Sequence, residues 1–498
     1  MKLNLESIKD RASWDAMGIA LPRFDIERVR EETRENPTWV HFGAGNIFRA
    51  FPCAALQTLL EEGLTDRGVI ACESYDPEII DRAYTPFDNL SLLCVLRADG
   101  RIDRKVIGSV TEALKMDEAG MARLMEIFEN PSLQMASLTV TEKAYTPENP
   151  MMNVLCLLLA RRYEQTKLPL AMVSMDNCAH NGDKLRAAML PAAKAMVDAG
   201  KAPAAFYTYM EEEVAFPNTM IDKITPHPDA EVAGMLSDLG FEDVDIIRTT
   251  RGTVSAAFVN AEQAEYLVIE DTFPNGRPPL DKAGIVFTDR ETVDKVEKMK
   301  VGTCLNPLHT ALAILGCLLG YTKISNEMGD EDLRRFVEKL GYGESLPVVE
   351  DPGVVSPRAF LDEVLTKRVN NPFLPDTPQR IATDTSQKLP VRFGWTIQAT
   401  KDKQTLYCVP FVFAAWLRYL TGVDDMGNTF EPSSDPRMAE VRARMAGGLT
   451  DELLSDASLF GADLVAIGLA GRVRSMFSEM MEGEGAVRRA LQKVVGDA

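Results

Sequence analysis

The sequence contains few cysteines, and no two of them are closely spaced. Its eight cysteines include no CxxC motif. Most of them lie inside apolar runs, where a free cysteine behaves as a small hydrophobic residue. This distribution argues against a disulfide framework and a zinc ribbon, and it predicts a cytoplasmic protein.

Histidine is scarcer still. A metal site built mainly on histidine would need most of the four that exist, which are His41, His180, His227 and His309. The sequence therefore predicts a protein without a bound metal. Of the four, His180 and His227 are expected in loops.

Basic residues are outnumbered, with 54 lysines and arginines against 74 acidic residues and a formal charge of −20. Nucleic acids and anionic membranes both need a basic surface, so the charge excludes both as partners. The longest apolar candidate, around residues 310–321, is too short to span a bilayer, and residues 1–11 do not resemble a signal peptide. We expect a small-molecule partner and a monomer or small homo-oligomer.

What the chain does contain is 498 residues with 46% hydrophobic content, enough for two or three domains. Strand and helix patterns alternate along its first half, which predicts a doubly wound Rossmann-type α/β domain over residues 1–287. Helical patterns then dominate, which predicts an α-helical substrate and catalytic domain over 288–498, with the active site in a cleft between the domains. The expected strands are 39–42, 68–72, 90–96, 105–110, 134–140, 168–174 and 244–248. The expected helices are 48–60, 119–129, 151–165, 183–199, 292–301, 307–320, 330–340, 357–368, 405–420, 436–445 and 462–481.

The first expected strand runs into a turn with two glycines before a helix. Gly43 suits a tight turn, whereas Gly45, which has no Cβ, lets the backbone approach a pyrophosphate at the helix N-terminus. Phe48 occupies the place of the usual third glycine. Arg49, just inside the helix, either faces phosphate or lies on the surface. The predicted cofactor contacts of this turn are Gly43, Gly45, Asn46, Ile47 and Arg49.

The second strand ends at Glu73, nearly thirty residues after Gly45. An acidic residue here can hydrogen-bond the adenosine ribose diol and repel a 2′-phosphate. The alternative is an ordinary solvated strand end. Together with the glycine turn, Glu73 favours NAD over NADP as the cofactor.

Five further blocks follow in a particular order and spacing. With the glycine turn, they resemble the long-chain mannitol dehydrogenase family, and within it the fructuronate reductases, also called mannonate oxidoreductases. The resemblance covers residues from about 37 to about 480. The blocks are Thr139–Tyr145, Met175–Gly182, Pro217–Pro226, Lys300–His309 and Arg380–Pro390.

Hydride transfer to a ketone needs a proton donor, hydrogen-bond donors for the developing alkoxide and a fixed substrate chain. A lysine can supply the proton without a metal. The resemblance implies that Lys300 is this acid and base and that Asn177 and Asn306 donate to the substrate oxygen. It further implies that His309 places the substrate.

The resemblance also assigns residues around the catalytic group. It places Thr141 and Glu142 at the cofactor. It implies substrate contacts from Asp222, Arg380, Lys388 and Lys143.

The sequence departs from the family between Lys300 and Asn306, where five residues stand instead of the usual four. Pro307 favours the first turn of a helix and would break a continuous one. We therefore expect a new helix to begin at Asn306, or a kink, with Asn306 and His309 on one face. Lys298 remains an alternative for the catalytic lysine.

The resemblance implies an NAD-dependent dehydrogenase that reduces fructuronate to mannonate. The alternatives are a mannitol or arabinitol 2-dehydrogenase, a tagaturonate reductase, or a dinucleotide-binding sensor with a decayed site. A keto-uronate carries a carboxylate that needs a cation in a closed cleft. We expect Arg380 to bind it, assisted by Lys388 or Lys143; the other candidates are Lys223 and Arg392.

Overall fold

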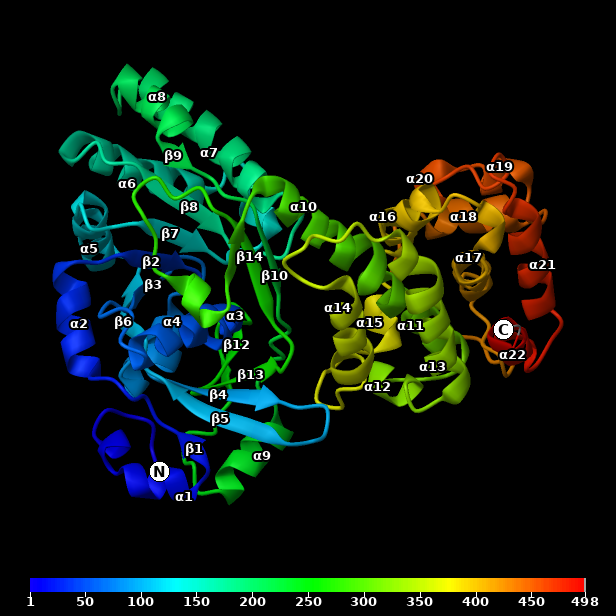
Figure 1. Ribbon diagram of the computed structural model, residues 1–498, viewed down its shortest axis with the longest axis horizontal. Helices are drawn as coiled ribbons and strands as arrows, with labels where there is room; N and C mark the ends of the chain where they lie inside the picture. Colours follow the sequence, from blue (N-terminus) through cyan, green and yellow to red (C-terminus); the bar gives the residue numbers. More distant parts are fainter. Residues whose placement is uncertain (497–498) are drawn as a thin grey trace. The chain divides into compact units, whose positions relative to one another are not determined.

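The computed structural model describes residues 1–496 and divides the chain into two compact units (Figure 1). The first unit comprises Met1–Arg97 and Arg101–Asp294. The second comprises Ala98–Gly100 and the chain from Lys295 onward. The chain passes from one unit to the other within α10 (Arg290–Met299), a few residues after the boundary that the sequence predicts.

The first unit contains the predicted doubly wound sheet. Six parallel strands lie in the order β6-β3-β2-β7-β8-β9, and the order reverses between β2 and β7. Ligands of such sheets bind outside the carboxyl ends of the strands at this reversal, and the glycine turn follows β2. The strands are β2 (Trp39–Phe42), β3 (Val69–Glu73), β6 (Val110–Lys115), β7 (Met135–Leu138), β8 (Leu170–Ser174) and β9 (Val214–Ala215).

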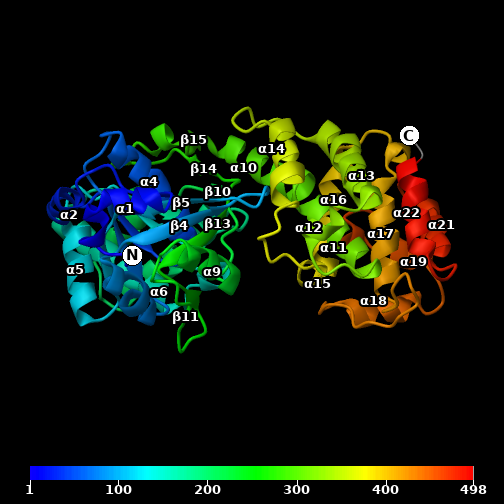
Figure 2. The ribbon, with the colours of Figure 1, turned by 90° about the horizontal axis from the view of Figure 1, so that it is seen from below.

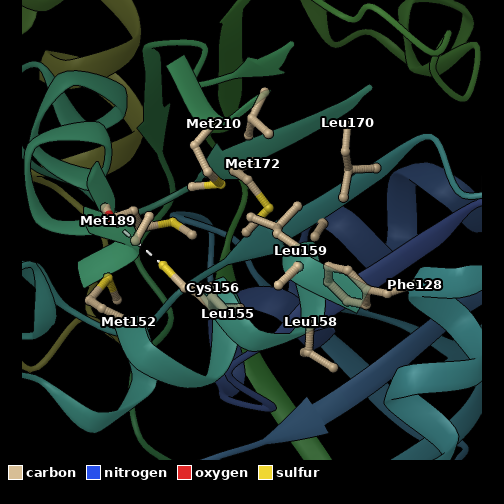
Figure 3. Close-up of a cluster of buried hydrophobic side chains, with 14 of the residues drawn as sticks. Phe128, Met152, Leu155, Cys156, Leu158, Leu159, Leu170, Met172, Met189 and Met210 are labelled. Atoms are coloured by element: carbon tan, nitrogen blue, oxygen red, sulfur yellow. Dashed lines mark hydrogen bonds between the residues drawn. The ribbon is translucent and has the colours of Figure 1, made fainter. Parts of the chain in front are cut away.

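Both faces of this sheet are buried, so its strands read as continuous apolar runs. Val40 and Phe42 point into one apolar cluster, which is shown in part in Figure 3. Trp39 points into the opposite cluster, which includes side chains of α4 (Pro52–Glu61). The helices that contribute to the first cluster are α5 (Glu118–Glu129), α6 (Pro150–Gln165), α7 (Asn181–Asp198) and α8 (Ala204–Glu212).

His41 lies on the second of these faces and is fully buried. Its ring nitrogens contact the Ser137 hydroxyl at 2.6 Å and the Thr139 hydroxyl at 2.9 Å, and the ring stacks on Phe48. Burial lowers its pKa to about 3, so the ring is neutral. His41 therefore ties β2 to β7 as a structural residue.

Smaller sheets complete the first unit, as Figures 1 and 2 show. The expected strand pair at 90–96 and 105–110 exists, but in a separate mixed sheet ordered β1-β5-β4-β13. The strand expected at 244–248 was wrong in length, since only two of its residues pair, as β11 of the β11–β12 hairpin. The additional strands are β1 (Ile19–Ala20), β4 (Ser91–Leu96), β5 (Ile102–Ile107), β10 (Thr219–Asp222), β11 (Ile247–Arg248), β12 (Val254–Ser255), β13 (Phe258–Glu262), β14 (Tyr266–Glu270) and β15 (Val286–Thr288).

The helix expected over 48–60 is two helices. α3 (Asn46–Ala50) ends before Phe51, and α4 begins at Pro52. Proline cannot donate an intrahelical hydrogen bond but fits the first turn of a helix, so Pro52 ends one helix and starts the next.

The second unit is helical, as predicted. The sequence did not predict α16 (Thr385–Ala399), because Pro390 lies inside it, or α22 (Ala486–Gly496). The helix expected at 462–481 begins only at Ala470. The other main helices of the second unit are α11 (Asn306–Leu318), α13 (Glu331–Glu338), α14 (Pro357–Glu363), α17 (Cys408–Tyr419), α18 (Met438–Met445) and α21 (Ala470–Met480).

One helical run, Arg290–Leu318, is long and apolar enough to cross a membrane by length and composition alone. It is longer than the apolar segment expected from the sequence, because the residues before Asn306 continue the helix. Of its most apolar window, 83% is buried in the structure, as in the core helix of a soluble protein.

Candidate functional site

A pocket of about 860 Å³ lies in the first unit at the carboxyl ends of the parallel strands. Its volume suits a large small-molecule ligand. Most of the predicted cofactor residues line it, as does His227 in the loop after β10. The predicted residues in its wall are Gly43, Gly45, Asn46, Ile47, Glu73 and Thr141.

The two glycines of the turn serve different purposes. Gly43 has φ of +106°, and a Cβ there would lie 2.3 Å from the Thr139 carbonyl oxygen. A Cβ on Gly45 would meet nothing within 4 Å. Gly43 is therefore required by the fold, whereas Gly45 keeps the pocket wall open to a ligand.

Glu73 lines the pocket, but its carboxylate has contacts that the sequence did not predict. One oxygen accepts the Ala44 N–H at 2.8 Å, and the other accepts those of Tyr75 and Asp76 at 2.8 and 3.0 Å. Three backbone N–H groups thus fix the side chain, and it joins the glycine turn to the loop after β3.

Two predicted cofactor residues do not line the pocket. Arg49 is 1% exposed and donates to the Ser255 hydroxyl and to the carbonyl oxygens of Ala256 and Ala257. Because Ser255 lines the pocket, Arg49 supports its wall from behind. Glu142 is exposed and pairs with Lys184 at 2.5 Å. Arg49 therefore acts on the pocket through Ser255, and direct cofactor contact by Arg49 and Glu142 stays a prediction.

Asp176, two residues after the buried end of β8, holds the loop that forms one wall of the pocket. Its carboxylate accepts the N–H groups of Val140 and Thr141 at 3.0 and 2.9 Å and the hydroxyl of Tyr145. Thr141 has φ of +74°, a strained conformation for a residue with a branched side chain. Burial raises the pKa of Asp176, although these donors oppose the shift. The sequence analysis gave Asp176 only as part of the block Met175–Gly182.

Other predicted residues of the first unit lie outside the pocket wall. Asn177 is exposed in the loop before α7, and His180 directly precedes that helix. With His227 in the loop after β10, the loop positions predicted for both histidines are confirmed. Lys143 is exposed on a 3₁₀ turn. Asp222 ends β10 and is 4% exposed. Lys223 is paired with Glu265 at 2.5 Å, so one carboxylate of the chain already balances its charge.

In the second unit, the chain passes through a π-helical turn at Lys300–Cys304. The Leu305 N–H donates to the Lys300 carbonyl oxygen at 3.2 Å, which is an i→i+5 bond. Such turns accommodate one additional residue and occur often at functional sites. The fifth residue between Lys300 and Asn306 is taken up in this way.

The two candidate lysines differ in burial. Lys300 is 3% exposed, whereas Lys298 is exposed and its ammonium lies 4.9 Å from the centre of the Trp395 ring. An acid that must act in a closed site is better provided by a buried lysine. The structure therefore favours Lys300.

α11 begins at Asn306, with Pro307 in its first turn, as predicted. Asn306 and His309 are three residues apart and share a face of this helix. The His309 Nε2 atom lies 3.3 Å from the carboxylate of Asp376, a residue that the sequence analysis did not identify.

Asp376 joins His309 to Arg380. Asp376 is 6% exposed, and its carboxylate also pairs with the Arg380 guanidinium, whose own side chain is 61% exposed. Burial would raise the pKa of Asp376, but His309 and Arg380 hold it below its usual value. Arg380 is thus already paired with a carboxylate of the chain.

Two other cations lie one helical turn apart on α16. Lys388 donates to the carbonyl oxygens of Ile381 and Thr383, and Arg392 donates to the Thr310 hydroxyl. Within residues 1–496 neither forms an ion pair with a carboxylate. Burial lowers the pKa of Arg392 to about 10, and burial together with the charge of Arg392 lowers that of Lys388.

Across the described chain, residues 1–496, no three His, Cys, Asp or Glu side chains are grouped so that they could hold a metal ion. All eight cysteines are buried, and none of them forms a disulfide within residues 1–496.

Comparisons with known proteins cover both units. Residues 37–282 match the Mannitol dehydrogenase Rossmann domain, and residues 292–480 match the Mannitol dehydrogenase C-terminal domain. D-mannonate oxidoreductase of Thermotoga maritima is 46% identical, with 100% of this chain and 99% of the relative covered. Mannitol 2-dehydrogenase of Neosartorya fischeri is 31% identical, with 93% of each covered. A solved D-sorbitol dehydrogenase in substrate-free form superposes with a TM-score of 0.82 at 26% identity, covering 95% of this chain and 97% of that one.

Proposed function

Because the chain belongs to the mannitol dehydrogenase family of oxidoreductases that act on CH–OH groups, we propose that it reduces the keto group of a hexuronate with NADH. Fructuronate is the proposed ketone and mannonate the product. The relative from Thermotoga maritima, named D-mannonate oxidoreductase, supports this choice. We further propose that the protein acts in the cytoplasm on small molecules alone.

The observation that carries the choice of a hexuronate is the pair of cations on α16. Lys388 and Arg392 are partly buried, and neither forms an ion pair with a carboxylate within residues 1–496, in a protein with a net charge of −20; the carboxylates of Asp384 and Asp435 act on Lys388 only from a greater distance. Desolvated cations are costly unless they are paired. A substrate carboxylate would provide the missing partner, whereas a neutral polyol would not.

The pocket of the first unit fits a dinucleotide. The open surface at Gly45 leaves room for a pyrophosphate next to the amides that begin α3, and the buried edge at Glu73 lies where the adenosine end of NAD would bind. When bound, NADH supplies the hydride that reduces the ketone carbon.

The remaining chemistry belongs to the chain. In reduction, the Lys300 ammonium donates a proton to the substrate oxygen as that oxygen gains charge, and in oxidation the neutral amine takes the proton back. The Asn306 amide is proposed to donate a hydrogen bond to the same oxygen. His309, held by Asp376, is proposed to place the substrate chain. The role of Asn177 stays a prediction.

A substrate panel tests the proposal. Purified protein is given NADH with fructuronate, tagaturonate, fructose and xylulose, and turnover is followed at the absorbance of reduced nicotinamide. We expect fructuronate to have the highest kcat/KM. Fructose and xylulose lack the carboxylate, whereas tagaturonate carries both the keto group and the carboxylate and differs from fructuronate in the configuration of one hydroxyl. Faster turnover of tagaturonate would identify tagaturonate as the substrate instead. No turnover of any of these ketones would contradict the proposal that the protein is an NADH-dependent ketone reductase.

Metal removal is expected to leave the activity intact. The proposed proton donor is a lysine, and the described residues include no cluster suited to a metal. Activity is measured before and after dialysis against a chelator, with metal content measured in the same samples. Activity that is lost with a stoichiometric zinc ion and restored by its return would show that a metal provides the Lewis acid.

A further inference from the structure

The β11–β12 hairpin is fastened to the loop that follows β3. Asp76, 3% exposed, accepts the hydroxyls of Thr249 and Thr253 at 2.6 and 2.5 Å. Glu78 accepts the N–H of Thr250 at 2.9 Å. These contacts fix the tip of the hairpin beside the end of the pocket where β3 terminates.

The tip places an arginine in the wall of this pocket. Arg251 lines it, and its guanidinium lies 5.0 Å from the centre of the Tyr75 ring, which also lines it. Tyr75 is 64% exposed and stands two residues after Glu73. Among residues 1–496, no carboxylate forms an ion pair with Arg251. An exposed cation on an aromatic platform, without an acidic partner, is suited to bind an anion.

A second hollow, of about 260 Å³, adjoins the pocket at Glu73 and Ser74. Its size is sufficient for a phosphate group. Lys115 lines it and pairs with Asp81 at 3.0 Å. Asp117 also lines it, and its carboxylate caps α5 by accepting the Gly120 N–H at 2.9 Å.

Glu73, the acidic residue expected to repel a 2′-phosphate here, already accepts hydrogen bonds from the backbone. The Glu73 carboxylate accepts three backbone N–H groups, which offset its charge and hold it against the glycine turn. A ribose hydroxyl must therefore share these oxygens with amides, and a nearby phosphate meets a partly compensated carboxylate.

We propose that the pocket also accepts NADP(H), and that Arg251, positioned over Tyr75, is the residue that binds the adenosine 2′-phosphate. The proposal rests on the dinucleotide-binding function proposed for this pocket. Glu73, Asp76, Asp81 and Asp117 still give this end of the pocket an excess of negative charge. NADH therefore remains the better cofactor, and NADPH is a second one that depends on Arg251.

The test measures binding without any sugar substrate. The fluorescence of NADH and of NADPH is titrated with wild type and with Arg251→Ala. Wild type is expected to bind both reduced cofactors. The variant should weaken NADPH about tenfold or more through loss of a charge-assisted contact, while NADH changes less than about threefold. Arg251→Lys should recover part of the loss, because it restores the charge but not the planar fork.

A matched control lies on the same hairpin. Arg248 is exposed and does not line the pocket, so Arg248→Ala removes the same charge and should leave both affinities near wild type. No binding of NADPH by wild type, or equal weakening of both cofactors by Arg251→Ala, would overturn the proposal. Because no hexuronate is present, a failure of the substrate assignment would leave this binding result unchanged.

Discussion

Replacing Lys300 by alanine is expected to lower kcat for fructuronate reduction by about 10²–10⁴-fold, the usual contribution of a positioned acid. The ammonium group serves both directions of the reaction, so mannonate oxidation should fall equally. NADH binding should persist, because the cofactor pocket described above is lined only by residues of the first unit. Turnover is measured by nicotinamide absorbance and binding by fluorescence titration.

Lys298 provides the matched control for this experiment. It is two residues away, carries the same charge and is exposed next to Trp395. Lys298→Ala should therefore retain most of the activity. Near-normal turnover of Lys300→Ala together with an inactive Lys298→Ala would show that the catalytic lysine is Lys298, two residues earlier in the chain.

Replacing Arg392 by alanine is expected to erase most of the preference for fructuronate over fructose. A buried carboxylate that loses its cation is destabilised by about 2–5 kcal/mol, which is roughly thirtyfold or more in kcat/KM. Fructose has no carboxylate, so its kcat/KM should change much less. Lys388→Ala should act in the same direction, since the two cations lie one turn apart on α16. The quantity to measure is the ratio of kcat/KM for the two ketones.

Arg380 is the comparison variant in this series, because the sequence analysis favoured it for the same role. Its guanidinium is paired with Asp376 and largely exposed, so Arg380→Ala should reduce the preference less than Arg392→Ala does. Thermal unfolding of each variant checks that the fold is kept. A larger effect of Arg380→Ala than of Arg392→Ala would indicate that Arg380 binds the substrate carboxylate. A wild type that prefers fructose or mannitol would refute the hexuronate assignment.

The parts of the fold that the sequence predicts are those set by local pattern. β2, the glycine turn and β3 are recognisable because buried parallel strands read as apolar runs and because Gly43 needs a positive φ. α11 was predicted to begin at Asn306, since Pro307 favours a first turn. By contrast, α16 was missed because Pro390 suggests a break, whereas the helix continues through this proline.

The parts of the site that could not be predicted depend on contacts between distant residues. Glu73 ends its strand as expected, but the amides that hold its carboxylate come partly from the glycine turn. Arg49 follows that turn, yet it faces the backbone after β12. Asp376 has no motif of its own, and only the folded second unit brings it to His309. Chain periodicity carries no information about such pairings.

The π turn at Lys300–Cys304 has a consequence for comparing sequences and for the history of this segment. In an α-helix each residue advances the direction of the side chains by about 100°, so an inserted residue would normally turn Lys300 away from the face that carries Asn306 and His309. A single i→i+5 bond confines that shift to one turn. Alignments of relatives with four intervening residues should therefore place their gap inside Lys300–Leu305, within a helix, rather than in a loop. An insertion at this point could be inherited without dismantling the site around it.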